Sequence, residues 1–256
     1  MFEALKNIVR LQRQKFLRVI LLLFSDRLVI SDKAILIIAP HPDDETFGCG
    51  GLMAAKVRAG KKVSVVFLTN GEKSLPSHPA EEVAGRRKES ALRALEKLGP
   101  DSAATHWLEL PDGSVPRRGS DAFTRMKERL LEILNRTGAE ELYTTGPLEG
   151  WSDHLAAWEL ATDAAKEAPH PIDLYLYWVW AWYYTGLTKL PKLPWHRMRL
   201  LSLEETLFEK KREALACYTR NRTTEGLPYM GELPAAFLRA FDWPYEVFAK
   251  VETDEV

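Results

Sequence analysis

The stretch IIAPHPDDETFGCGG, residues 37–51, decides the fold of this chain and points to its chemistry. An apolar run over residues 34–39 stops at a proline, and a histidine, two aspartates and a glutamate follow before a cluster of glycines. A short run that is apolar throughout is typical of a strand buried on both faces of a parallel sheet. The charged residues therefore lie at the carboxyl end of a buried strand, and the glycines let the backbone pass close to them and open a helix.

Strand and helix patterns alternate over residues 34–185. This alternation predicts an α/β fold: a Rossmann-like, doubly wound and mainly parallel sheet of about five or more strands, with helices on both faces. The sequence predicts strands at 34–39, 62–69, 105–111, 141–146 and 173–182, and helices at 52–60, 80–99, 121–138 and 153–168. It further predicts a loop or irregular strand over 186–202, a helix over 201–220 with Ser202 as a candidate N-cap, and a packed tail over 233–252.

Composition excludes several classes of protein. The chain has 256 residues, of which 46% are hydrophobic, and this is enough for one sizeable core. The 35 basic and 36 acidic residues nearly balance, so no nucleic-acid partner is expected. The two cysteines, Cys49 and Cys217, form no CxxC pair, which predicts neither a disulfide framework nor a thiolate zinc site and favours a reducing, cytoplasmic compartment.

The first 33 residues form a separate segment in this prediction, an amphipathic helical extension of a single domain over 34–256. The apolar run 19–24 is too short to cross a bilayer, which needs about 20 residues. A basic amphipathic helix within residues 1–30 can lie on an anionic membrane surface. The alternative is a helix packed on the domain, or on a second subunit of a homo-oligomer.

Chemically reactive side chains follow several of the predicted strands, at the sheet edge where open α/β folds bind ligands. His41 and Asp44 follow the first strand and His154 follows the fourth, and three N/O ligands with an open position are the pattern of a catalytic zinc site. Asp43 lies beside these ligands and is placed to take a proton from a water molecule. Asp112 follows the third strand, and Asp153 precedes His154.

Two other interpretations of this motif stay open at the level of the residues. The acidic stretch can be a polar turn that caps a helix, with Asp44 or Thr46 as N-cap. Signalling receiver domains also place an acidic pair after their first strand and an aspartate after the third, as Asp43, Asp44 and Asp112 do. Receivers are about half this length, however, have no ligand-type histidine before the pair, and need a lysine after strand five, which Lys189 matches only loosely.

Seven segments together resemble the LmbE-like, or PIG-L-type, N-acetylglucosaminyl deacetylases. The resemblance covers residues 34–250, and the first motif is highly specific. The segments are PHPDDE (40–45), GCGG (48–51), LTNGE (68–72), RRKESALRALEKLG (86–99), LELPDG (108–113), WSDH (151–154) and KKREALACYTRN (210–221).

The resemblance implies a Zn²⁺-dependent hydrolase that removes the acetyl group from an N-acetylated amino sugar, as a GlcNAc-type glycoconjugate or glycolipid. It implies His41, Asp44 and His154 as zinc ligands and Asp43 as general base. Contacts to the sugar, or to its attached group, fall to Asp112, to Trp151 and to one of the pair Arg86/Arg87. Asp153 is expected to orient a histidine from behind, as metal sites commonly require.

Trp151 departs from the family pattern, in which a histidine at this position helps to stabilise the tetrahedral oxyanion. An indole N–H donates a hydrogen bond but carries no charge, and the loss of one oxyanion donor typically costs about 10²–10³ in rate. Trp151 can stack on a sugar ring or donate its N–H, or His78 or His106 can fill the role. The remaining alternative is a catalytically weakened or inactive relative that binds metal and glycan.

The aromatic run YLYWVWAWYY, residues 175–184, is predicted to continue the fifth strand with its side chains alternating between two faces. Packing against helices and a platform for a sugar or lipid both remain open for it.

Overall fold

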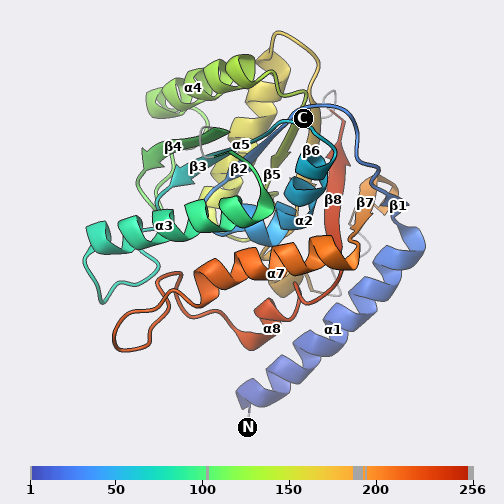
Figure 1. Cartoon of the computed structure of the whole chain (residues 1–256), viewed down its shortest axis with the longest axis vertical. Helices are drawn as coiled ribbons and strands as arrows, with labels where there is room; N and C mark the ends of the chain where they lie inside the picture. Colours follow the sequence, from blue (N-terminus) through green and yellow to red (C-terminus); the bar gives the residue numbers. More distant parts are fainter. Residues whose placement is uncertain (1, 102–103, 187–192, 194, 253–256) are drawn as a thin grey trace.

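An eight-stranded sheet with helices on both faces forms the body of the protein (Figure 1). The computed structural model describes residues 2–101, 104–186, 193 and 195–252. β8 runs antiparallel to both neighbours, while every other strand pairing in the described sheet is parallel. The predicted α/β class and mainly parallel sheet are confirmed.

The order of the strands reverses between two neighbours in the middle of the sheet. The chain moves outward from β2 to β3 and β4 on one side, and from β5 to β6 on the other. β2 and β5 are therefore neighbours at the point where the order reverses, which is where open α/β sheets bind ligands. Across the sheet the strands are β1 (Asp26–Arg27), β7 (Met198–Ser202), β8 (Tyr245–Val251), β6 (Asp173–Tyr177), β5 (Glu141–Thr144), β2 (Ile35–Ala39), β3 (Val63–Thr69) and β4 (Thr105–Leu110).

Alternate residues of the central strand supply two cores. Ile35 and Ile37 of β2 belong to one buried cluster and Leu36 and Ile38 to the other, as a strand buried on both faces requires. The first core is covered by α2 (Asp44–Arg58), α3 (Ala80–Leu98), α7 (Glu205–Thr219) and α8 (Ala235–Leu238), and the second by α4 (Asp121–Thr137) and α5 (Ser152–Glu167).

The glycine cluster lies inside α2, which begins at Asp44; the prediction that this helix starts only at residue 52 was wrong. A side chain would not fit at two of its positions. A Cβ atom on Gly48 would lie 2.1 Å from the Tyr177 ring, and one on Gly51 would lie 2.4 Å from Leu203. The glycines therefore allow α2 to pack directly on β6 and on the segment that follows β7.

A buried ion pair between Glu246 and Lys211 binds backbone groups of α2. The Glu246 carboxylate of β8 accepts the backbone N–H groups of Gly51 and Leu52 at 2.7 and 2.8 Å. Lys211 Nζ of α7 donates to the Phe47 carbonyl at 2.7 Å and to Glu246 Oε1 at 2.6 Å. These side chains thus bind backbone groups of the helix that carries the acidic motif, and they tie it to two C-terminal elements.

Three details of the C-terminal half correct the sequence prediction. The strand predicted over 173–182 ends at Tyr177, because the Glu149 carboxylate accepts the N–H groups of Val179 and Trp180 and the chain turns into α6 (Ala181–Tyr184). The N-cap of α7 is Glu204 rather than Ser202, which ends β7. The interval predicted as a loop or irregular strand, 186–202, contains η3 (Trp195–Arg197) and the regular strand β7, while 187–192 and 194 lie outside the described residues.

The N-terminal segment contributes to the same sheet and core. Leu17 and Leu21 of α1 (Phe2–Phe24) are fully buried, and Gln14 donates to the Ala236 carbonyl at 2.7 Å. β1 then pairs in parallel with β7. Within the part of the chain that the structure describes, no helix has the length and hydrophobicity to cross a bilayer.

Lys211→Met tests the importance of the buried ion pair. The change leaves the buried Glu246 carboxylate without its cation, which typically costs about 3–5 kcal/mol in the free energy of unfolding. Urea denaturation measures this. Arg58→Met is the control, because it breaks an exposed pair with Glu204 and should change stability little. Equal effects of the two substitutions would contradict the account.

Candidate metal and catalytic site

Side chains from three segments meet at the carboxyl ends of the central strands. They include both histidines and all the aspartates that the sequence analysis selected. The loop after β2 supplies His41, Asp43 and Asp44, the loop after β4 supplies Asp112, and the first turn of α5 supplies Asp153 and His154.

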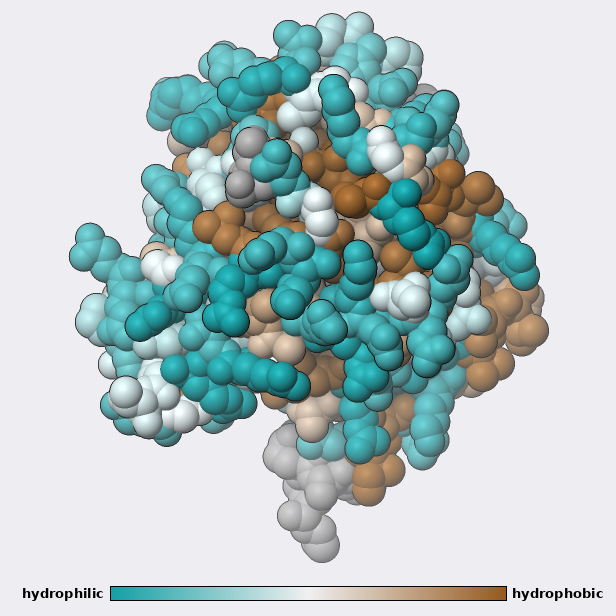
Figure 2. All heavy atoms as spheres, in the orientation of Figure 1, coloured by the Kyte–Doolittle hydropathy of each residue, from teal (hydrophilic) through white to brown (hydrophobic). Residues whose placement is uncertain are grey.

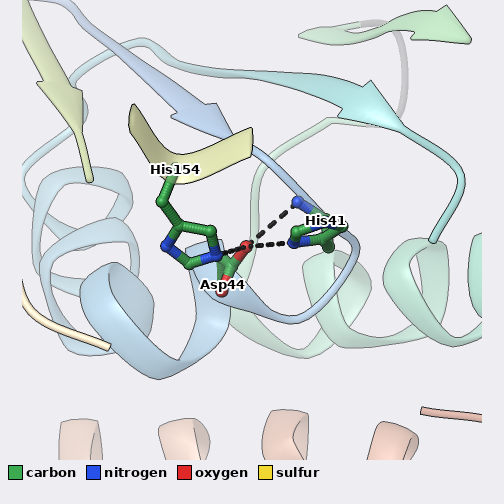
Figure 3. Close-up of side chains that lie close together, drawn as sticks. All are labelled: His41, Asp44 and His154. Atoms are coloured by element: carbon green, nitrogen blue, oxygen red, sulfur yellow. Dashed lines mark hydrogen bonds and ion pairs between the residues drawn. The ribbon is translucent and has the colours of Figure 1, made fainter. Parts of the chain in front are cut away.

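Asp44 joins the two histidines (Figure 3). Its Oδ2 atom lies 3.2 Å from His41 Nδ1 and 3.4 Å from His154 Nε2, and it also accepts the backbone N–H of His41 at 3.0 Å. One potential ligand atom from each residue lies within 4.8 Å of the others. Asp44 and His154 are each 1% exposed, so this triad is shielded from bulk water and open only beside His41.

A second group shares His41. Its Nε2 atom lies 3.2 Å from Asp112 Oδ1 and 3.2 Å from Asp153 Oδ2. Backbone N–H groups fix both carboxylates: Gly113 and Val115 donate to Asp153 at 2.6 and 3.1 Å, and an N–H at residue 73 donates to Asp112 at 2.8 Å. His41 is therefore held between carboxylates from three segments.

The pKa values follow from this crowding of carboxylates. Burial alone would lower the pKa of His41, but hydrogen bonds to Asp112, Asp153 and Asp44 outweigh it and raise that pKa well above its usual value. Burial opposes ionisation of Asp112, yet the hydrogen bond and charge of His41 lower its pKa to about 2. This pair thus favours a positive charge on His41 beside an ionised Asp112.

Asp43, the residue before Asp44, has a strained backbone. Its φ of 134° lies in the region that favours glycine, and its side chain makes no capping bond to α2 although it is the N-cap. Arg87 holds it: one guanidinium nitrogen donates to Asp43 Oδ2 at 2.7 Å and to the Pro42 carbonyl at 2.5 Å, and the other donates to the Gly71 carbonyl at 3.1 Å. Burial raises the pKa of Asp43 to about 8, against the lowering effect of Arg87.

Two residues that the sequence analysis did not select support this loop. Glu45 is fully buried, accepts the Asp43 N–H at 2.9 Å and accepts the Tyr218 hydroxyl at 2.6 Å. Glu45 lies inside the PHPDDE motif and Tyr218 inside the late-helix segment, so both belong to segments that carry the family resemblance. Their contact joins residues 173 positions apart, which no periodicity reveals.

Glu149 is a third unselected residue, and it lies behind His154. Its carboxylate lies 3.6 Å from His154 Nδ1, and it accepts the N–H groups of Val179 and Trp180, just beyond the end of β6. Both side chains are 1% exposed. His154 therefore directs Nε2 toward Asp44 and Nδ1 toward Glu149.

The two arginines of the predicted pair have different surroundings. Arg87 is buried beside Asp43, whereas Arg86 is exposed, bonds Glu89 at 3.2 Å and lies over the Tyr229 ring at 5.9 Å. The structure thus places Arg87, of the two, in the site.

Trp151 stands at the rim, as the N-cap of α5. It is 46% exposed and packs edge-on against Trp180 with ring centroids 5.6 Å apart. His106 lies near the amino end of β4, away from the strand ends that carry the site, and contacts Arg136. His78 pairs with Glu225.

A protein-family model matches the part of the chain that carries the triad. The model described as PIG-L, GlcNAc-PI de-N-acetylase, matches residues 36–165, just over half of the chain, and this range contains His41, Asp44 and His154. The chain belongs to the PIG-L family.

Individual members of the PIG-L family are similar at lower coverage. A 1D-myo-inositol 2-acetamido-2-deoxy-alpha-D-glucopyranoside deacetylase of Corynebacterium urealyticum is 28% identical in an alignment of 172 positions, which covers 54% of this chain and 51% of that protein. The chain thus spans about half the length of the curated relatives it matches.

Solved structures share the fold. The N,N'-diacetylchitobiose deacetylase of Pyrococcus horikoshii has a TM-score of 0.63 at 18% identity, over 86% of this chain and 84% of that one. GalB of Pseudomonas putida, a 4-carboxy-2-hydroxymuconate hydratase, has a TM-score of 0.56 at 21% identity, over 72% of this chain and 78% of that one. The fold therefore does not by itself determine the reaction.

The strained backbone at Asp43 predicts an unusual preference for glycine. Asp43→Gly should unfold with a free energy about 1 kcal/mol higher than Asp43→Ala, because glycine adopts this φ without a Cβ clash. Urea denaturation compares the two variants. At Leu92, a half-exposed position inside α3, the order should reverse, because alanine is the better helix former by about 1 kcal/mol. A more stable alanine variant at position 43 would show that the φ is not strained in solution.

Proposed function

We propose that this protein is a zinc-dependent hydrolase that removes the acetyl group from an N-acetylated amino sugar in a GlcNAc-type glycoconjugate or glycolipid. The observation that carries the proposal is the triad of His41, Asp44 and His154 beside the carboxyl ends of β2 and β5, with the Asp43 carboxylate next to it in the chain. Deacetylases of N-acetylated sugars among the relatives support the same chemistry.

The triad fits zinc better than the second group does. It offers two imidazoles and one carboxylate, which is a common donor set of catalytic zinc sites. In the second group both oxygens of Asp153 already accept backbone N–H groups. His41, Asp44 and His154 would therefore hold the metal, while Asp112 and Asp153 stabilise His41. When bound, zinc polarises a carbonyl and lowers the pKa of a coordinated water toward about 7.

Asp43 supplies the proton transfers in this proposal. Its buried carboxylate takes a proton from the water that attacks the acetamide carbon and returns a proton to the departing nitrogen. A C–O bond forms and the C–N bond breaks, so that acetate and a free amino sugar are released. Arg87 keeps the carboxylate in position, because its guanidinium donates to Asp43 and also to the Pro42 and Gly71 carbonyls.

The rim provides contacts for the sugar. Asp112 is a carboxylate that is ionised at neutral pH and can accept hydrogen bonds from sugar hydroxyl groups. Trp151 presents an exposed indole three residues before His154, packed against Trp180, and suits stacking on a sugar ring. Arg86 is exposed beside Glu89 and Tyr229, and in this proposal it would contact only a group attached to the sugar.

A second candidate function rests on Trp151, which replaces the histidine of the family pattern. Without a charged oxyanion donor, the protein would bind zinc and glycan but turn over slowly or not at all. Zinc bound at full occupancy, together with no turnover of any N-acetylated sugar, is the signature of this alternative.

Acetate release from a panel of N-acetylhexosamine derivatives tests the proposal, with zinc added or removed by a chelator. We expect zinc-dependent release, and we expect His154→Ala and Asp44→Asn to lose zinc at least about tenfold. His170→Ala is the matched control, because His170 contacts the Ala139 carbonyl outside the site and should leave both zinc content and activity unchanged. Zinc binding that survives both ligand substitutions would overturn the metal assignment.

A further inference from the structure

The first helix carries apolar side chains on two faces. Leu17 and Leu21 are buried against the domain, and a second set of apolar side chains faces outward. A surface helix normally buries its apolar stripe and leaves only polar side chains outside. The second apolar face indicates that the outer side of α1 meets something other than water.

The inward arginines have specific partners. Arg13 donates to the Trp182 and Tyr183 carbonyls at 3.2 and 2.7 Å, and Arg18 donates to the carbonyl at residue 239 at 2.7 Å. Arg10 lies 4.3 Å above the Tyr183 ring. These contacts fix the rotation of the helix, so that the apolar residues cannot turn inward without breaking them.

The outward apolar side chains in the C-terminal half of α1 share one helical face. Phe16, Val19 and Leu23 follow the i, i+3, i+7 spacing of a single helical face. Figure 2 shows the hydrophobic side chains gathered along α1, at the lower right. The exposed fractions are 56% for Ile8, 60% for Val9, 52% for Phe16, 53% for Val19, 49% for Leu22, 69% for Leu23, 64% for Phe24 and, beyond the helix, 80% for Val29.

Charge indicates which partner this face meets. Of the five basic residues within 6–24, Arg10, Arg13 and Arg18 contact the domain, while Lys15 is exposed and borders the apolar row together with Arg27. The same range contains no acidic residue. Asp26, next to Arg27, is paired with Arg199. A second copy packed face to face would bring the same positive charges together, whereas anionic lipid headgroups would neutralise them.

We propose that α1 lies in the plane of an anionic bilayer surface, with its apolar face among the headgroups. The helix is not hydrophobic enough to span the bilayer, and a basic helix with one apolar face is the type that binds at the interface. Arg13 and Arg10 place this helix against α6, near the rim of the site, so docking would hold the rim close to the membrane. The inference does not depend on the proposed hydrolase activity.

Vesicle flotation of the full chain tests the inference. We expect binding to vesicles of phosphatidylcholine mixed with phosphatidylglycerol, weaker binding at high salt, and little binding to phosphatidylcholine alone. The triple variant Phe16→Ser/Val19→Ser/Leu23→Ser should lower the partition coefficient at least about tenfold. Lys15→Glu should lower it at least about fivefold, through the lost attraction to anionic lipid.

Leu92→Ser is the matched control, because it removes an exposed apolar side chain from α3, on another part of the surface, and should not alter binding. Unchanged thermal unfolding of the triple variant would show that it folds. The proposal is overturned if the chain binds neither kind of vesicle. It is also overturned if the chain dimerises in solution through α1 and the triple variant abolishes the dimer, since a second copy would then occupy the face.

Discussion

The contact of one carboxylate with two histidines is the constraint on which the rest of the structure depends. Asp44 reaches His41 at the end of β2 and His154 at the start of α5, and it does so while almost fully buried. This is feasible only because β2 and β5 are neighbours at the reversal of strand order. The topology of the sheet therefore brings together ligands that are separated by more than 100 residues in sequence.

Burying so many ionisable groups has to be compensated, and the fold compensates it locally. Arg87 pairs with Asp43, Tyr218 donates to Glu45, and Lys211 pairs with Glu246. Each partner comes from a helix on the same face of the sheet as α2. α3 and α7 thus act as polar supports for the motif as well as covers for the core.

Much of the fold could be predicted from the sequence, because the apolar strand at 34–39 and the helices around it carry strong local patterns. The C-terminal part could not. β8 inserts between β6 and β7 through long-range pairing that leaves no periodic signal, and β6 stops at Tyr177 because Glu149, far away in sequence, binds the next N–H groups.

At the site, motif residues were predictable because the strand-end rule locates them, whereas Glu149 was not, because only its burial against His154 distinguishes it. The ambiguity between Arg86 and Arg87 was likewise one that only the rotation of α3 could resolve.

The central claim is that Asp43 performs proton transfer beside a metal that other residues hold. Its most direct test is the variant Asp43→Asn, which keeps the shape of the side chain and removes its basicity. Zinc content and acetate release are measured on the same preparation, with Asp163→Asn, at an exposed ion pair with Arg118, as the control. The account predicts zinc bound as in the unmodified protein and acetate release reduced about 10²-fold or more. Turnover close to that of the unmodified protein in the zinc-loaded variant would contradict it.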